Sequence, residues 1–212
     1  MCGRVIRTTP GEVLQQLFDL TSMPEVLPTR YNLAPTDPIP VIREPHRLEL
    51  LRWGLHIPGP RISGINARAE SLSRAVYRDD KRCLVVVDGF YEWRSLDGTK
   101  QPYLIARADH APMALAGLCD DAGGCAIITV PAQGVVATIH DRMPVMLKPE
   151  VFAAWLDPGL REVQPMLRAA SASDLTCYPV SRAVNNVRND SPVLLEPVAE
   201  ADVARGKTLS LF

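Results

Sequence analysis

The sequence has no long apolar run and almost no net charge. None of its hydrophobic stretches approaches the roughly 20 residues that a helix needs to cross a bilayer, and the N-terminus lacks the apolar core of a signal peptide. The formal charge is −1 at pH 7, which argues against indiscriminate attraction to nucleic acid, so any such binding must use a local patch. These absences predict a cytoplasmic protein without a membrane partner.

Cysteine is scarce as well, and its spacing argues against a zinc site. The chain has 5 cysteines, and no two of them form the CxxC pair that commonly holds zinc. Apart from the one at position 2, they are predicted to be buried packing residues: Cys83, Cys119, Cys125 and Cys177. We therefore expect neither a metal nor a cofactor.

The composition is that of a globular chain. Hydrophobic residues make up 47% and charged residues 22% of the 212 residues, which is enough chain to bury a core. The 19 prolines are scattered, which indicates many loops between short elements. Strands and helices do not alternate regularly, so we predict an α+β fold with a curled, mostly antiparallel, barrel-like β-sheet and peripheral helices.

Local patterns predict the individual elements. Strands are expected at 3–7, 38–43, 47–53, 83–87, 90–93, 102–106, 113–118, 125–130 and 175–180. Helices are expected at 10–20, with a capping box from Thr9 to Glu12, around 75–77, and at 135–139, 149–156 and 162–169. The stretch 30–36 is interpreted as a loop, and Asp88-Gly89 as the turn of a hairpin. One domain is predicted over residues 1–190, followed by a tail over 191–212.

The N-terminus, Met1-Cys2-Gly3-Arg4, carries the most distinctive chemistry. Removal of Met1, which is usual before a residue as small as cysteine, leaves an α-amine and a thiol on adjacent carbons of Cys2. Such a 1,2-aminothiol condenses with an aldehyde to an imine, and the thiol then closes a thiazolidine ring. With pKa values of roughly 7.7–8.0 and about 8.5, both nucleophiles are available near neutral pH. The alternative is a disordered chain end.

Glu92 is a candidate general acid or base because aromatic residues flank it on both sides. Apolar surroundings raise the pKa of a carboxyl group and allow proton transfer near neutrality. The period of a strand puts Glu92 on the same face as Phe90 and opposite Trp93. The alternative is a solvent-facing glutamate on an edge strand.

His140 is a second candidate, as a general acid on a leaving oxygen. It opens the compact run His140-Asp141-Arg142-Met143-Pro144, whereas the other histidines occur in ordinary polar or loop contexts: His46, His56 and His110. The alternative is a structural ring that caps the C-terminus of a helix.

Asn66 and Arg68 form a third group. The Asn66 amide can orient a carbonyl or hydroxyl, and the Arg68 guanidinium offers two parallel donors to a phosphate. Alternatively, Asn66 caps a helix and Arg68 is solvated. Two further arginines could join Arg68 around an anionic backbone, and two tryptophans could stack on bases or pack in the core: Arg4, Arg142, Trp53 and Trp93.

Seven blocks of sequence together resemble one family. They are Met1-Cys2-Gly3-Arg4, Tyr31-Asn32-Leu33-Ala34-Pro35-Thr36, Trp53-Gly54-Leu55, Asn66-Ala67-Arg68-Ala69-Glu70-Ser71, Cys83-Leu84 with Asp88-Gly89-Phe90-Tyr91-Glu92-Trp93, Ala116-Gly117-Leu118, and Ile139-His140-Asp141-Arg142-Met143-Pro144-Val145-Met146-Leu147. In this order they are similar to the SRAP family, the SOS response-associated peptidases or abasic-site-processing proteins. The resemblance covers residues 2 to about 190.

The resemblance implies an enzyme that crosslinks itself to abasic sites in single-stranded DNA and shields them during replication. Cys2 would supply both nucleophiles, Glu92 would transfer protons, His140 would protonate the sugar ring oxygen, and Asn66 would position the sugar. Further residues would bind the strand or splay it: Arg4, Asn32, Pro35, Trp53, Arg68, Trp93 and Arg142. The family name also implies that Met1 is removed, autocatalytically or by a peptidase.

The last five residues of the tail include three large apolar side chains. The terminal Thr208-Leu209-Ser210-Leu211-Phe212 resembles the peptide by which bacterial replication proteins bind the sliding clamp, with Leu209, Leu211 and Phe212 as contacts. Alternatively, these apolar residues fold back on the core.

A cysteine peptidase with Cys2 as nucleophile and His140 as base is a competing hypothesis, as is a non-covalent DNA-binding module. We expect a monomer, associated with the nucleoid at replication forks.

Overall fold

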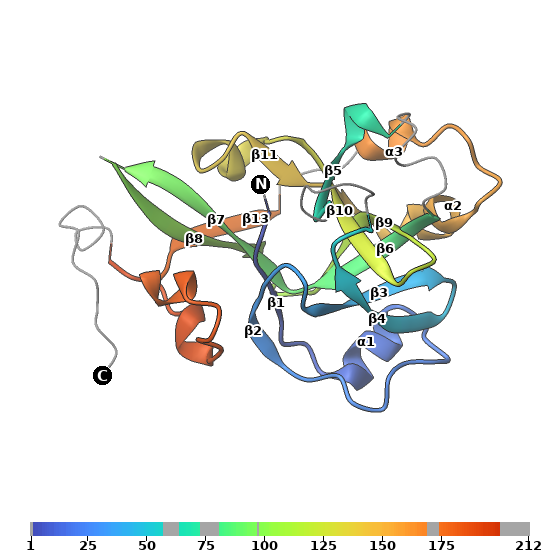
Figure 1. Cartoon of the computed structure of the whole chain (residues 1–212), viewed down its shortest axis with the longest axis horizontal. Helices are drawn as coiled ribbons and strands as arrows, with labels where there is room; N and C mark the ends of the chain where they lie inside the picture. The colour runs from blue at the N-terminus through green and yellow to red at the C-terminus, as the bar shows by residue number, and fades with distance from the viewer. Residues whose placement is uncertain (1, 57–63, 73–80, 97, 169–173, 200–212) are drawn as a thin grey trace.

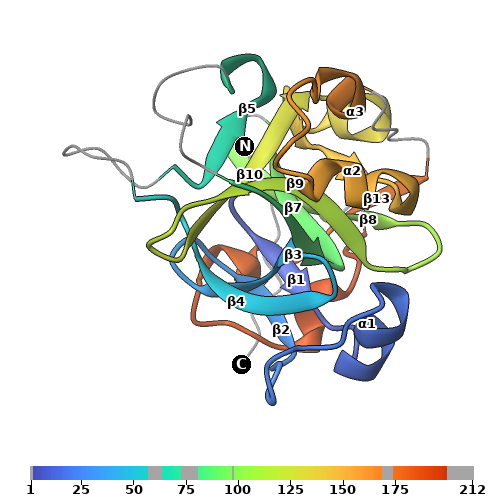
Figure 2. The same ribbon diagram turned by 90° about the vertical axis from the view of Figure 1, so that its right-hand side faces the viewer.

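The computed structural model describes residues 2–56, 64–72, 81–96, 98–168 and 174–199. Two β-sheets form its centre (Figures 1 and 2). The first sheet has five strands in the order β13 (Leu175–Pro179), β8 (Thr99–Arg107), β7 (Gly89–Leu96), β1 (Val5–Arg7) and β2 (Arg30–Leu33). The second has eight, in the order β11 (Arg142–Pro144), β10 (Gly124–Pro131), β4 (Arg47–Trp53), β3 (Pro38–Glu44), β6 (Lys81–Val87), β9 (Met113–Cys119) and β12 (Met146–Leu147), with β5 (Asn66–Arg68) beside β10.

Short helices surround these sheets. The α-helices are α1 (Gly11–Leu17), α2 (Phe152–Leu156) and α3 (Gln164–Arg168), and the 3-10 helices are η1 (Ala69–Ser71), η3 (Gly134–Thr138), η4 (Pro149–Val151), η5 (Arg182–Asn185) and η6 (Pro192–Leu195). Among the named strands of the described chain, only β4 and β5 pair with β10 in parallel; the other pairings are antiparallel. The prediction of an α+β fold with curled, mostly antiparallel β-structure is confirmed, but the strands form two sheets.

The side chains of β6 point alternately into two different hydrophobic cores. Val85 and Val87 join the core between the two sheets, whereas Leu84 and Val86 join a second core beneath the helices. Both faces of this strand are therefore buried, which explains why its sequence is a continuous β-branched run. A third core lies on the outer face of the five-stranded sheet, where Val184 and Leu194 of the C-terminal segment cover Tyr91.

The predicted hairpin at Asp88-Gly89 is wrong, because the chain changes sheets there. β6 belongs to the eight-stranded sheet, and β7 pairs with β1 and β8 in the other. The Asp88 carboxylate accepts hydrogen bonds from the amides of Thr8 and Thr9 and from the Thr9 hydroxyl. Gly89 is required at this corner, because an added Cβ would lie 2.9 Å from the Ile105 carbonyl oxygen.

The remaining predictions concern a capping box, a loop, a helix, the tail and the domain boundary. The capping box is wrong, since Thr9 is bound to Asp88 and α1 begins after Pro10 without a side-chain cap. Residues 30–33 form β2 rather than a loop, because β1 supplies a pairing partner. The helix expected at 75–77 and the tail end 208–212 lie outside the described residues. The fold itself continues past residue 190, since Leu194 is buried.

Candidate functional site

Cys2 lies in the core between the two sheets. Its side chain is fully buried, so the alternative of a disordered chain end is wrong. The Cys2 carbonyl oxygen accepts a hydrogen bond of 2.7 Å from the Asn66 side-chain amide. Asn66 is the first residue of β5 and is held by pairing with Ile127 of β10, so it does not cap a helix. The Asn66 Oδ1 atom is buried and has no hydrogen-bond partner among the described residues, which leaves an acceptor beside Cys2.

Glu92 reaches the same place from β7. It is 2% exposed, so the alternative of a solvent-facing glutamate is wrong. As its period predicts, Glu92 shares a side with Phe90, which lies in the same core cluster as Cys2, whereas Trp93 packs in the third core. Burial raises the pKa of the Glu92 carboxyl group, and nearby His140 partly opposes that rise.

The thiol and the carboxyl group influence each other. Burial raises the pKa of the Cys2 thiol well above its ordinary value, and the charge of Glu92 raises it further. Two acidic groups that share a poorly solvated site resist simultaneous ionisation. The site therefore favours a neutral thiol beside a group that can accept or return a proton.

His140 follows η3 and completes the group. Its Nδ1 lies 2.9 Å from the backbone nitrogen of Arg142 and 2.7 Å from the Asp141 carboxylate. The Arg142 amide donates to Nδ1 when that atom carries no hydrogen, and the Asp141 carboxylate accepts from Nδ1 when it does. The ring therefore contacts the two residues that follow it in the chain.

Two of these residues, Glu92 and His140, line a pocket of about 410 Å³ that opens at the surface. Five residues line it: Glu92, Trp93, Lys100, His140 and Asn185. It lies beside β7, which pairs with β8 along its whole length but with β1 only at Gly89 and Phe90. Glu92 and Trp93 lie beyond this paired part, after Tyr91, whose amide donates to the Arg4 carbonyl.

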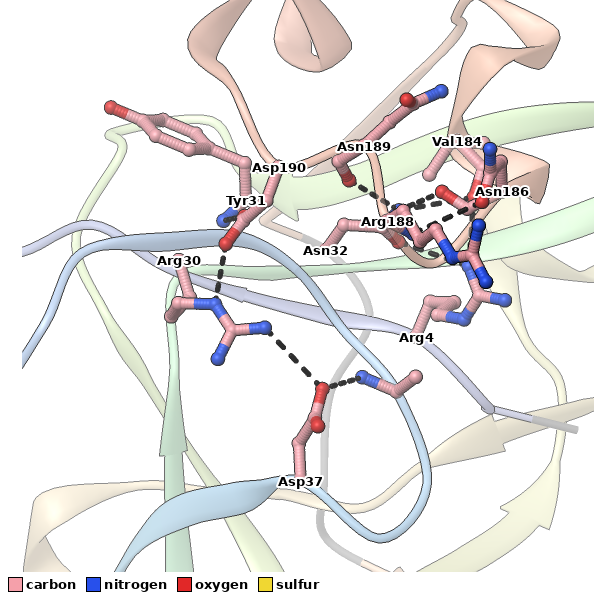
Figure 3. Close-up of polar contacts among 11 residues, drawn as sticks. Arg4, Arg30, Tyr31, Asn32, Asp37, Val184, Asn186, Arg188, Asn189 and Asp190 are labelled. Atoms are coloured by element: carbon pink, nitrogen blue, oxygen red, sulfur yellow. Dashed lines mark hydrogen bonds and ion pairs between the residues drawn. The ribbon is translucent and has the colours of Figure 1, made fainter.

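Two predicted strand-binding residues instead hold the protein together (Figure 3). The Arg4 guanidinium donates to Asn32 Oδ1 at 3.0 Å and to the Val184 carbonyl at 2.7 Å. Asn32 is fully buried, and its amide donates to the carbonyl oxygens of Val184, Asn186 and Asn189 at 3.2, 3.1 and 2.9 Å. Both side chains therefore fasten the segment 184–189 onto β2 and the residue that precedes β1.

Trp53 and Arg142 are also engaged internally. Of the two alternatives for Trp53, the structure has core packing: the indole is fully buried and donates to the Ile65 carbonyl at 3.0 Å. Arg142 is 8% exposed, and its guanidinium donates to both Glu70 carboxylate oxygens at 2.7 and 3.0 Å and to the Thr129 carbonyl. Neither side chain is presented to a ligand in this structure.

The remaining predicted residues are more accessible. Arg68 is exposed at the end of β5, Pro35 is half-buried in the loop after β2, and Trp93 is half-buried at the pocket. Sequence reasoning missed Lys100 and Asn185, which also line this pocket. No local motif marks either of them; Asn185 lies in a polar, irregular stretch, and only the tertiary contacts bring it to β7.

The cysteines other than Cys2 are mostly buried in the described part of the chain. Cys83, Cys119 and Cys125 are buried, as predicted, whereas Cys177 is half-buried. Within these ranges, no three His, Cys, Asp or Glu side chains are grouped so that they could hold a metal ion. No described helix has the length and apolar character needed to cross a membrane.

The chain is similar in sequence to one protein family and to individual named proteins. Residues 1–187 match the family described as SOS response associated peptidase (SRAP). The chain is 35% identical over 222 residues to the abasic site processing protein YoqW of Bacillus subtilis, covering 92% of this chain and 99% of the relative. It is 32% identical over 224 residues to the abasic site processing protein YedK of Escherichia coli, covering 93% and 100%.

A solved structure is similar in fold. The crystal structure of a protein from Bacteroides thetaiotaomicron superimposes with a TM-score of 0.77 at 21% identity, covering 93% of this chain and 100% of that one. At this identity the likeness supports the arrangement of the two sheets and nothing about activity.

Proposed function

Because this chain belongs to the SRAP family, we propose that it processes abasic sites in DNA by forming a covalent adduct through Cys2. The substrate is the ring-opened aldehyde of an abasic deoxyribose in a single strand. The observation that carries the proposal is the meeting of Cys2, Asn66 and Glu92 at one end of the two sheets, with His140 beside Glu92 in the pocket.

The reaction begins at the amine of Cys2, which becomes available when Met1 is removed. His140 gives a proton to the ring oxygen of the sugar as the bond from that oxygen to C1 breaks, and the C1 hydroxyl loses its proton to solvent, which leaves the aldehyde. The amine adds to the aldehyde carbon, and loss of water gives an imine. Asn66, whose amide holds the Cys2 carbonyl, positions the N-terminus and the sugar during this step.

The second step closes the ring. The Cys2 sulfur bonds to the imine carbon, the C=N double bond becomes single, and the thiol proton passes by way of Glu92 to the imine nitrogen. The overall change consumes one aldehyde and one aminothiol and releases one water. The thiolate is the nucleophile in this step, so Glu92 takes the thiol proton as the sulfur bonds to the imine carbon.

The decisive experiment uses two matched single-stranded oligonucleotides, one with and one without an abasic site. The wild-type protein is expected to give a heat-stable, slower-migrating band on a denaturing gel with the abasic strand alone. The Cys2→Ala variant retains an N-terminal amine and can form only the imine. It should therefore give no heat-stable band, but a product that borohydride traps.

Two results would contradict this proposal. Full-yield, heat-stable attachment by Cys2→Ala would show that sulfur is not used. Cleavage of peptides by a protein that leaves abasic strands unmodified would favour the peptidase. A reversible gel shift that does not require the abasic site would instead indicate a non-covalent DNA-binding module.

The setting of this activity is also part of the proposal. We expect a monomer that works in the cytoplasm at replication forks and reaches them through binding of its last residues to the sliding clamp. A chain that attaches once to each lesion needs no second subunit for the chemistry described.

A further inference from the structure

The pocket beside Glu92 has a mouth with its own chemistry. Glu92 is almost fully buried and the His140 side chain is 23% exposed, whereas Lys100 and Asn185 are exposed where the pocket opens. Lys100 comes from β8, opposite Ser95 of β7, and Asn185 ends η5. Neither residue belongs to the reacting groups proposed above.

Asn185 is held in one orientation. Its Oδ1 atom accepts a hydrogen bond of 2.7 Å from the indole nitrogen of Trp93, which can only donate. The side-chain nitrogen of Asn185 is therefore left with its two hydrogens for another partner. The backbone beside it is fastened as well, because Arg4 and Asn32 bind the carbonyl oxygens of Val184 and Asn186. A donor on a segment held in this way loses little freedom when it binds a ligand.

The charge around the pocket requires such donors. Carboxylates of Glu92 and of Asp141, which contacts His140, repel an entering phosphate when they are ionised. Among the described residues that line the pocket, Lys100 alone carries a fixed positive charge. Arg182 lies close to it, because its guanidinium donates to the hydroxyl of Thr99, the residue before Lys100.

We propose that Lys100 and Asn185 form a binding subsite for the phosphate next to the abasic sugar, with Lys100 supplying charge and the Asn185 amide supplying a directed donor. The inference rests on the proposed function for the identity of the strand. It adds a contact that places the sugar over the pocket before Cys2 reacts. Loss of this subsite should weaken capture of the strand and leave the bond-forming steps unchanged.

The test separates binding from chemistry. A fluorescent oligonucleotide with a tetrahydrofuran abasic analogue, which has no aldehyde, reports binding by anisotropy whether or not an adduct can form. Lys100→Ala is expected to weaken binding about 5-fold. It should also reduce the slope of log K against log salt concentration by about 0.7, the value for one phosphate contact on a single strand.

Substitutions at Asn185 test the directed donor. Asn185→Asp keeps an acceptor for Trp93 but replaces the amide donor by a negative charge that repels the phosphate, so it should weaken binding more than Asn185→Ala does. With a true abasic strand, both variants and Lys100→Ala should require more protein for half-maximal rate and reach the wild-type maximal rate. Lys148→Ala, an exposed lysine on another face near α2, is the matched control and should behave as wild type.

Three results would overturn the subsite. These are a salt slope for Lys100→Ala equal to that of Lys148→Ala, equal binding by Asn185→Asp and Asn185→Ala, or a fall in maximal rate without weaker binding. Failure of the wild-type protein to form any adduct would instead count against the proposed function. The analogue would still show whether Lys100 and Asn185 bind the strand.

Discussion

Individual side chains at this site owe their properties to burial. Cys2 and Glu92 both have raised pKa values, and removal from water is the largest cause for each. A carboxyl group whose pKa is raised toward neutrality can both give and take a proton during one reaction. The chemistry therefore depends on where these residues are placed as much as on what they are.

Glu92→Gln tests this placement. Glutamine keeps the size of the side chain but cannot transfer a proton, so the single-turnover rate of adduct formation should fall on the order of 10²-fold. The same substitution at Glu150, which is exposed in η4, is a suitable control. An unchanged rate in Glu92→Gln would mean that another group moves the proton.

The raised pKa of Glu92 also predicts how stability varies with pH. The folded state holds the proton more tightly than the unfolded state, so this group's contribution is fully present below 4.5 and is lost as pH rises through the raised value. Relative to wild type, Glu92→Gln should thus gain more unfolding free energy at about pH 7 than at about pH 4. Urea denaturation at both pH values measures this difference, and equal gains would contradict it.

Among the elements, the segment 182–190 is the one whose position is hardest to predict from its own sequence. It contains a 3-10 turn, η5, and its backbone is held chiefly by the side chains of Arg4, which precedes β1, and Asn32 of β2. Asn32 alone serves three carbonyl groups of this segment from a fully buried position (Figure 3). Removing this amide takes a donor from all three carbonyl groups and an acceptor from Arg4, although the Val184 carbonyl keeps Arg4 and the Asn186 carbonyl keeps the amide of Asn189.

Asn32→Ala should therefore lower the free energy of unfolding by about 3 kcal/mol. Asn186→Ala removes an exposed side chain of the same kind that only accepts from the Arg188 amide, and should change stability by less than about 0.5 kcal/mol. Chemical denaturation of both variants gives the comparison. Equal effects would show that the segment is held by packing of Val184 and Leu194 instead.

At the scale of the whole molecule, the site draws on both sheets. Cys2 and Glu92 come from the strand system of the five-stranded sheet, whereas Asn66 lies on β5 beside β10 of the other. His140 lies between η3 and β11, at the same end of the fold as the pocket. The two sheets must be packed together for the reacting groups to meet. Disruption of the core between the sheets should therefore unfold the protein and abolish its activity.

The tail is expected to work independently of this core. Deleting residues 208–212 should weaken binding to a purified sliding clamp at least about 10-fold, since the apolar anchors Leu209, Leu211 and Phe212 are lost. The rate of adduct formation on a free oligonucleotide should not change. Surface plasmon resonance and the gel assay measure the two effects. Equal clamp affinity for the truncated and full chains would contradict the prediction.

Much of the fold follows from sequence because strands carry local patterns. The runs at 38–53, 83–87 and 113–130 form β3, β4, β6, β9 and β10 with closely similar bounds, since alternating or continuous apolar residues mark strand and burial directly. Family resemblance named the group Cys2, Asn66, Glu92 and His140, and the structure places Asn66 against Cys2 and Glu92 beside His140. The aminothiol itself needs no fold to be identified.

Tertiary structure alone decided the rest. Residues 30–33 form a strand because β1 lies beside them, and Asp88 ends a sheet rather than turning a hairpin because Thr8 and Thr9 bind its carboxylate. Arg4 and Asn32 look like ligand-binding residues until segment 184–189 is seen to occupy them. Sequence determines which kinds of group a side chain can bind. Contacts between distant parts of the chain determine which of those groups it binds in the folded protein.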